Sequence, residues 1–232
     1  MKKTLFFILG ILMCFIALFA GGCSEFKGDY KDVTIDEVSA FAVKVSGKET
    51  VNYAKGVNVE FELTNQSGEK VFKVRSIDNG NGFGSSGALI IKNGNEVEYT
   101  IEFWYAGGTL YTKTLYPHSD PVYATSQTDY TLFISGYTNG LNQLTLASMI
   151  YGDTAEKGLS YSMTKTGEET KVCVSVESNA YNTDSGNCYF VYDSFNRLQS
   201  IKAEMKSTYG NYNFELTPWK GEVESPDYNR FN

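Results

Sequence analysis

The sequence predicts an α+β fold in which one amphipathic helix lies on a long antiparallel β-sheet. Two observations carry this prediction. Apolar residues recur at helical spacing close to residue 35, and after it alternating apolar and polar residues form strand-like runs at intervals of roughly 10 to 15 residues. Turn residues separate these runs, so we expect the strands to pair antiparallel and not through βαβ units.

The composition is that of an ordinary globular protein. The chain has 232 residues, of which 42% are hydrophobic and 20% charged, and its net charge is −7. These values exclude a disordered chain and a multi-span membrane protein. Because lysines are scattered in a chain of negative net charge, there is no basic stripe for a phosphate backbone, and we expect no nucleic-acid partner.

The first 22 residues predict an export signal. Lys2 and Lys3 precede Leu5–Ala20, an uncharged run of about sixteen residues, which is shorter than the roughly 18 to 20 that a membrane-spanning helix needs. The run ends in the small residues Ala20, Gly21 and Gly22, followed by Cys23. Cleavage before Cys23 would leave a chain of 210 residues, long enough for a single domain, with a net charge of −9.

Small residues directly before a cysteine resemble the lipobox of bacterial lipoproteins. The resemblance implies that the Cys23 thiol carries a diacylglycerol anchor on the extracytoplasmic face of a bacterial membrane. An ordinary signal peptide, cleaved nearby with Cys23 incidental, is the alternative. We therefore expect a lipoprotein signal peptide over 1–22, the lipidated cysteine and a polar tether over 23–33, and a single domain over 34–232.

A helix is predicted directly after the tether. Thr34 and Glu37 have the spacing of a capping box, in which a hydroxyl and a carboxylate satisfy the first backbone N–H groups. The apolar residues at helical spacing are Ile35, Val38, Phe41, Ala42 and Val45, and Gly47 provides a stop.

Strands are predicted over most of the remaining chain. In residues 96–105 the apolar side chains from Val97 to Tyr105 share one face, while Glu96, Glu98 and Glu102 lie on the other. Asn93-Gly94 before this run predicts a tight hairpin. The other expected strands cover 57–63, 71–77, 88–92, 109–115, 130–137, 159–165, 170–177, 188–193, 197–206 and 211–217. Residues 141–151 fit both a helix and a strand, and we favour a short helix.

Two cysteines, Cys173 and Cys188, lie in neighbouring strand-like runs. Antiparallel pairing of these runs would place the thiols opposite one another, so we expect a cross-strand disulfide in an exported chain. Two free thiols are the alternative.

The order of these elements resembles the periplasmic lipoprotein-carrier superfamily of LolA-like and LppX-like proteins. The resemblance lies in an opening amphipathic helix, a strand with a turn and a tyrosine (106–111), a strand–turn–strand unit (191–198) and a closing acidic segment with proline (221–227) before a final Phe231. It covers residues 34–231. It implies a curved antiparallel half-barrel, covered by helices, with an apolar face that accommodates acyl chains.

No motif of the sequence supports catalysis. Gly82 to Gly87 match a G-x-G-x-x-G string, but no helix can follow before the Asn93-Gly94 turn, so we expect no dinucleotide cofactor and a flexible hairpin loop instead. His118 is the single histidine, in a loop between two prolines, and the carboxylates of Glu96, Glu98 and Glu102 are typical of a solvated face. We expect no catalytic residue, no metal, no cofactor and no enzyme activity.

The functional prediction is a non-enzymatic lipoprotein that binds a lipid or another amphiphile in an apolar groove between sheet and helix. The candidate lining residues are Phe41, Val59, Phe61, Tyr99, Ile101 and Phe103, and for each one taken singly a place in a filled hydrophobic core is the stronger interpretation. The alternative is a cell-surface interaction module that binds wall glycan or a partner protein through exposed aromatic side chains, which are frequent in this chain of 17 tyrosines.

Overall fold

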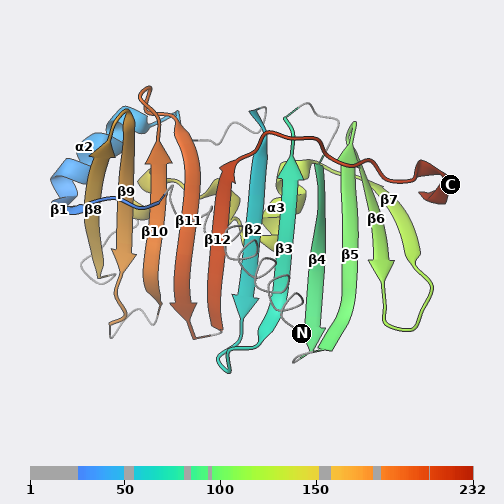
Figure 1. Ribbon diagram of the computed structural model, residues 1–232. Coiled ribbons are helices and arrows are strands. Elements are labelled where there is room, and N and C mark those ends of the chain that lie inside the picture. Colours follow the sequence, from blue (N-terminus) through green and yellow to red (C-terminus); the bar gives the residue numbers. More distant parts are fainter. Residues whose placement is uncertain are drawn as a thin grey trace, which may run out of the picture.

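Twelve antiparallel strands form a single open sheet, shown in Figure 1. The computed structural model describes residues 26–49, 55–80, 85–93, 96–151, 158–179, 184–208 and 210–231. The predicted signal peptide, Cys23, Gly82 and Gly84 lie outside these residues. The strand order is β1-β8-β9-β10-β11-β12-β2-β3-β4-β5-β6-β7, so β1 and β7 are the two edges and the sheet does not close.

Two meanders make up the sheet. The first contains β2 (Val57–Thr64), β3 (Lys70–Asp78), β4 (Ser85–Asn93), β5 (Glu96–Ala106), β6 (Thr109–Leu115) and β7 (Val122–Gln127). The second contains β8 (Leu159–Thr166), β9 (Glu169–Val176), β10 (Ser185–Tyr192), β11 (Leu198–Ser207) and β12 (Gly210–Pro218). They join where β12 pairs with β2, and β1 (Lys31–Val33) adds to β8.

The helices α2 (Ile35–Val45), α3 (Tyr130–Tyr137) and α4 (Leu146–Tyr151) all contribute to one core with the sheet, as do side chains near the 3₁₀ turn η2 (Leu141–Gln143). They lie behind the strands in Figure 1. Phe41 of α2 contacts Tyr192 of β10, and Phe133 of α3 contacts Phe103 of β5. One face of the sheet therefore carries the apolar contacts, and we call it the helix side. The opposite face is called the open side.

The predicted capping box of α2 is present. The Thr34 hydroxyl accepts a hydrogen bond from the Glu37 N–H at 3.3 Å, and the Glu37 carboxylate accepts one from the Thr34 N–H at 2.8 Å. Two of the orphan donors at the helix start are thereby satisfied locally, which explains why α2 could be predicted from residues three apart.

The strand predicted over 130–137 is wrong, because these residues form α3. The Asp129 side chain caps the helix by accepting a hydrogen bond from the Leu132 N–H at 3.1 Å. Aromatic and branched residues favour strands on average, but the apolar residues Tyr130, Phe133, Ile134 and Tyr137 also have helical spacing. Packing of Tyr130 against Tyr105 and of Tyr137 against Phe72 makes the helix the observed state. The short helix favoured within 141–151 is confirmed as η2 and α4.

Gly87 belongs to strand β4 and not to the flexible loop predicted for this region. It pairs with Phe103, whose ring lies over the glycine. A Cβ atom here would approach Phe103 Cζ to 2.5 Å and would also collide with the Arg75 carbonyl oxygen. Gly87 therefore makes room for an aromatic ring that is fully buried on the helix side.

The predicted tether over 23–33 is packed in its described part. Phe26 is buried on the open side, where its ring lies 6.2 Å from that of Tyr189, and Lys31–Val33 form β1. The Lys171 ammonium also donates a hydrogen bond to the Lys27 carbonyl oxygen at 3.2 Å. The packed part of the described chain thus includes Phe26, eight residues before the predicted start of the domain at residue 34.

Candidate functional site

The six candidate groove residues belong to the helix-side layer or contact it at its margin, but they differ in burial. Val59, Phe61 and Phe103 are almost completely buried and belong to the core. Phe41 and Ile101 are partly buried at its margin. Tyr99 is also half-buried, with its ring 5.6 Å from that of Tyr116. The first three residues are core packing, and only the other three offer surface to a ligand.

A cleft of about 510 Å³ lies at the β1 edge of the sheet. The apolar residues that line it are Val33 of β1, Ile35 at the start of α2, and Leu159 and Tyr161 of β8. Asp32 and Ser160 also line the cleft and supply polar groups. The sequence did not predict this site, because the site depends on β1. A strand of three residues is too short to show an alternation of apolar and polar residues.

The helix side also contains a buried carboxylate, that of Glu49. Its Oε1 accepts a hydrogen bond from the Leu146 N–H at 2.9 Å and one from the Tyr192 hydroxyl at 3.0 Å. Burial, followed by the nearby Glu49 carboxylate, raises the pKa of Tyr192 far above its usual range, so this phenol is a permanent donor. Glu49 therefore links the segment after α2 to α4 and to β10 inside the core, which is a structural role.

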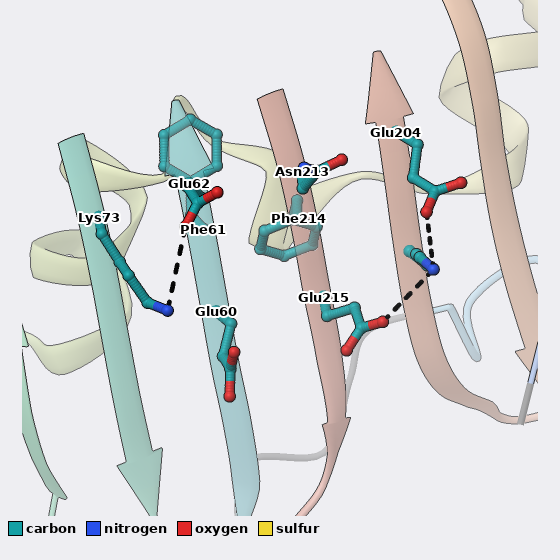
Figure 2. Close-up of a pocket in the computed structure, with 9 residues that line it drawn as sticks. Glu60, Phe61, Glu62, Lys73, Glu204, Asn213, Phe214 and Glu215 are labelled. Carbon is teal, nitrogen blue, oxygen red and sulfur yellow. Dashed lines mark ion pairs between the residues drawn. The ribbon is translucent and has the colours of Figure 1, made fainter. Parts of the chain in front are cut away.

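On the open side, charged residues of four neighbouring strands surround a groove of about 250 Å³ (Figure 2). The groove is lined by Lys202 and Glu204 of β11, Asn213, Phe214 and Glu215 of β12, Glu60, Phe61 and Glu62 of β2, and Lys73 of β3. The positions follow from the register, since Lys202 pairs with Glu215, Glu215 with Glu60, and Glu62 with Lys73. Because side chains alternate along a strand, the charged and polar side chains of the groove lie on the face opposite the buried side chains of Phe61 and Phe214.

Ion pairs connect the charged side chains of the groove, both within β11 and between neighbouring strands. Lys202 Nζ lies 2.8 Å from Glu204 and 3.6 Å from Glu215, and Lys73 Nζ lies 4.0 Å from Glu62. Burial raises the pKa of Glu215, an effect that Lys202 opposes and that the carboxylate of Glu60 adds to. The groove is thus rich in acceptors, and its charge suits a polar or cationic group.

Aromatic side chains gather at two places on the open side, and the two ends of the described chain cover both. Tyr189 of β10 lies against Phe26 and Tyr30 near the start. Trp104, Tyr111 and Tyr123 contact Phe231 in the 3₁₀ turn η3 (Tyr228–Phe231) near the end. Figure 1 shows the final segment running over the sheet from β12 towards β7. These rings are packed by the chain itself, so they do not form a free stacking platform.

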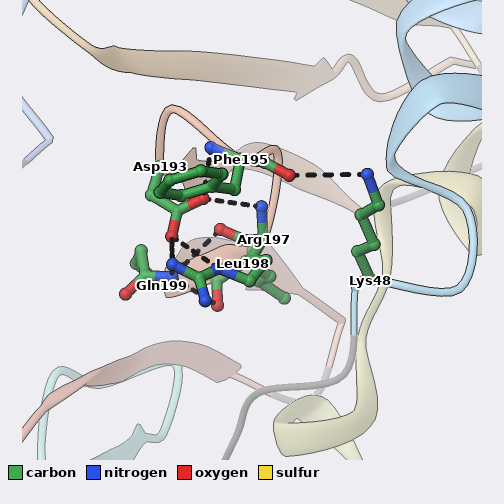
Figure 3. A network of polar contacts seen from close by, with 6 residues as sticks. All are labelled: Lys48, Asp193, Phe195, Arg197, Leu198 and Gln199. Carbon is green, nitrogen blue, oxygen red and sulfur yellow. Dashed lines mark hydrogen bonds and ion pairs between the residues drawn. The ribbon is translucent and has the colours of Figure 1, made fainter.

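The turn between β10 and β11 is held by Asp193 (Figure 3). Its carboxylate accepts hydrogen bonds from the N–H groups of Phe195 and Arg197, both at 2.9 Å, and pairs with the Arg197 guanidinium at 2.7 Å. These bonds hold the pKa of Asp193 below its usual range although partial burial acts in the opposite direction. Lys48, after α2, joins the turn by donating to the Phe195 carbonyl oxygen at 3.5 Å.

The expected disulfide between Cys173 and Cys188 is absent, since both cysteines are free and buried. The register explains the error: Cys188 pairs with Val174, and Cys173 pairs with Tyr189. The two thiols therefore point to opposite faces of the sheet. Burial raises the pKa of Cys188 to about 12 and also raises that of Cys173, so both thiols are protonated at neutral pH and poor nucleophiles.

Within the described ranges, no group of three or more histidine, cysteine, aspartate and glutamate side chains could hold a metal ion. In the same part of the chain, no helix combines the length and the apolar character needed to cross a membrane. His118 lies exposed in the turn between β6 and β7.

No known protein family and no curated protein matches this chain. Among solved structures, a DNA polymerase sliding clamp from Pseudomonas aeruginosa is 11% identical, over 87% of this chain and 66% of that chain, with a TM-score of 0.15. A similarity at this level carries no argument about fold or function.

Proposed function

We propose that this protein is a non-enzymatic lipoprotein, attached through Cys23 to the extracytoplasmic face of a bacterial membrane, which binds a lipid or another amphiphile on the helix side of its sheet. One observation carries the proposal. Around the buried core, sixteen apolar side chains of the helix side remain only partly buried, among them Phe41, Phe133 and Leu159. A helix layer that leaves so many apolar groups partly exposed has surface that a hydrocarbon chain can cover.

The cleft at the β1 edge is the proposed entry. Its size, about 510 Å³, falls within the range of small-molecule sites. Val33, Ile35 and Leu159 would contact the hydrocarbon, while Asp32 and Ser160 would contact the polar end of the ligand. Such a combination of apolar walls and a few polar groups is typical of sites for amphiphiles.

The finer architecture is part of the same proposal. A short strand, a helix, a six-strand meander, further helices and a five-strand meander follow one another along the chain. This order supports a resemblance to the curved half-barrel of LolA-like carriers. We infer that the sheet and its helices form such a half-barrel, with the ligand between the two layers.

The anchor and the ligand site are tested separately. Mass spectrometry of the mature protein is expected to show a diacylglyceryl group on Cys23, and the mass of the unmodified chain would contradict the anchor. For the ligand site, the full mature protein is titrated with the fluorescent fatty acid cis-parinaric acid.

Ile35→Gln in the cleft is expected to weaken the binding of this probe by about tenfold. Val122→Gln, at the opposite edge of the sheet, is the matched control, because the two side chains are 45% and 54% exposed. Equal affinities of the two variants, or no binding by the parent, would contradict the proposed site.

An interaction module is the second candidate, favoured by the charged groove of Figure 2. In this case a wall polymer or a partner protein would bind across β11, β12, β2 and β3. Co-sedimentation with purified cell-wall fragments tests this function. Binding that is lost in Glu204→Gln, which removes a carboxylate of the groove, but kept in Ile35→Gln would favour it over amphiphile binding.

A further inference from the structure

The turn between β10 and β11 presents a phenylalanine to solvent in a fixed position. The Phe195 side chain is 67% exposed, although it is one of the largest apolar side chains in the chain. Its backbone N–H donates to Asp193, and Asn196 next to it adopts a left-handed conformation with φ of 59°. The ring is therefore carried by a turn whose main chain is closed by several hydrogen bonds (Figure 3), not by a free loop.

Two cations accompany this ring. The guanidinium carbon of Arg197 lies 4.9 Å from the centre of the Phe195 ring, and the Lys48 ammonium lies 3.5 Å from the Phe195 carbonyl oxygen. The Leu198 N–H also donates to the Lys48 carbonyl oxygen at 3.2 Å, which fixes the segment after α2 beside the turn. Asp193 pairs with Arg197 at 2.7 Å, and the buried carboxylate of Glu49 accepts from the Leu146 N–H and the Tyr192 hydroxyl. The exposed part of the turn therefore presents the Phe195 ring beside the Arg197 and Lys48 cations.

Phe26, three residues after the proposed lipid anchor, packs on the same pair of strands. Phe26 packs on Tyr189 of β10, and its ring lies 5.9 Å from the Lys202 ammonium of β11. Cys23 precedes Phe26 by three residues, so its Cα lies at most about 11 Å away. Tyr189 precedes Asp193 by four residues, which is about 14 Å along a strand. A bilayer that holds the acyl chains of Cys23 therefore lies close to β10 and β11.

We propose that Phe195, with Arg197 and Lys48, is a second contact with the bilayer that carries the anchor. This inference rests on the proposed lipidation of Cys23. The ring of Phe195 enters the interface between head groups and acyl chains, where aromatic side chains are favoured, and the two cations bind lipid phosphate groups. A single lipid group tethers a protein to a bilayer without fixing its orientation. A second contact, at the turn of the same strand pair, would fix the orientation and strengthen the attachment.

Fluorescence quenching tests the contact in the full mature protein, reconstituted in vesicles of phosphatidylcholine and phosphatidylglycerol with brominated acyl chains. Phe195→Trp reports on the turn. Leu132→Trp is the matched control, because Leu132 of α3 is also 67% exposed but α3 packs on the half of the sheet that contains β3 and β5. The emission of Trp104 and Trp219 in the parent is subtracted from both.

We expect the bromine atoms to quench the emission of the Phe195→Trp variant at least twofold more strongly than that of the Leu132→Trp variant. Equal quenching of the two variants, in protein that floats with the vesicles, would overturn the membrane contact and leave the proposed anchor intact. Protein that does not float with the vesicles would overturn the anchor and, with it, the contact.

Discussion

The two faces of the sheet are built from the same strands but are stabilised in different ways. On β2, Val59 and Phe61 are buried on the helix side, while the alternate residues Glu60 and Glu62 form ion pairs with Arg75, Lys70 and Lys73 on the open side. The helix side excludes water, and the open side stays wet except where the chain ends cover it. Alternation of apolar and charged residues along each strand can therefore specify an apolar layer on one face of a sheet, while cross-strand ion pairs form on the other face.

The largest effect is expected from a cavity on the helix side. Phe103 is fully buried, with its ring 4.9 Å from that of Phe133 and over Gly87. Phe103→Ala is expected to lower the free energy of unfolding by about 3 to 5 kcal/mol, measured by urea denaturation. A loss below about 1 kcal/mol would show that this layer is not closely packed, and would remove the contrast between the faces.

A smaller loss is expected where the helix side contains charge. Glu49→Ala leaves the Leu146 N–H and the Tyr192 hydroxyl without their acceptor, so we expect a loss of about 2 to 3 kcal/mol. Glu49→Gln is the control, since its amide oxygen can still accept, and it is expected to lose less. If both variants were as stable as the parent in urea denaturation, the carboxylate would not support the core.

The pH dependence of stability is expected to depend on a carboxyl group of the open side, that of Glu215. Burial raises the pKa of Glu215 in the folded protein above that of the unfolded chain, so the folded state binds the proton more tightly. This group therefore favours folding most below its ordinary pKa of 4.5, and stability falls as the pH rises through the raised pKa. In Glu215→Gln we expect this fall to be shallower, as measured by unfolding at several pH values. A steeper fall would contradict the direction of the shift.

The smallest effect is expected from an exposed ion pair on the open side. Glu60 and Arg75 lie 3.3 Å apart, and both side chains are largely accessible to water. Glu60→Gln is expected to change the free energy of unfolding by less than about 0.5 kcal/mol. It also removes a negative charge next to Glu215, which offsets part of the loss. A destabilisation as large as that of Glu49→Ala would show that the open side is not simply solvated.

Local patterns predicted the elements whose determinants lie within a few residues. The capping box of Thr34 and Glu37 marks the start of α2, and the alternation in residues 96–105 assigns Phe103 and Glu102 to opposite faces of β5. The strand β7 was missed, because a largely exposed edge strand has no buried face to create a pattern.

The disulfide was predicted from proximity in sequence, but the register decides it. A shift of the pairing register by one residue moves every side chain of a strand to the other face of the sheet. The sequences of 171–176 and 185–192 do not show which residues of the two strands pair with one another. The position of the candidate site could not be predicted from the sequence for a similar reason. The apolar faces were assigned correctly, yet the cleft at the β1 edge and the groove of Figure 2 are made by strands distant in the sequence.

By itself, the sequence determined the α+β class, the capped first helix, the antiparallel pairing and the residues that share each face of β5, because these depend on contacts between neighbours in the chain. Only the tertiary structure decided that β12 pairs with β2, that residues 130–137 are helical, and that Phe26 and Phe231 cover the open side. Those outcomes depend on which surfaces meet after the chain has folded back on itself, and the burial gained there outweighs local preference.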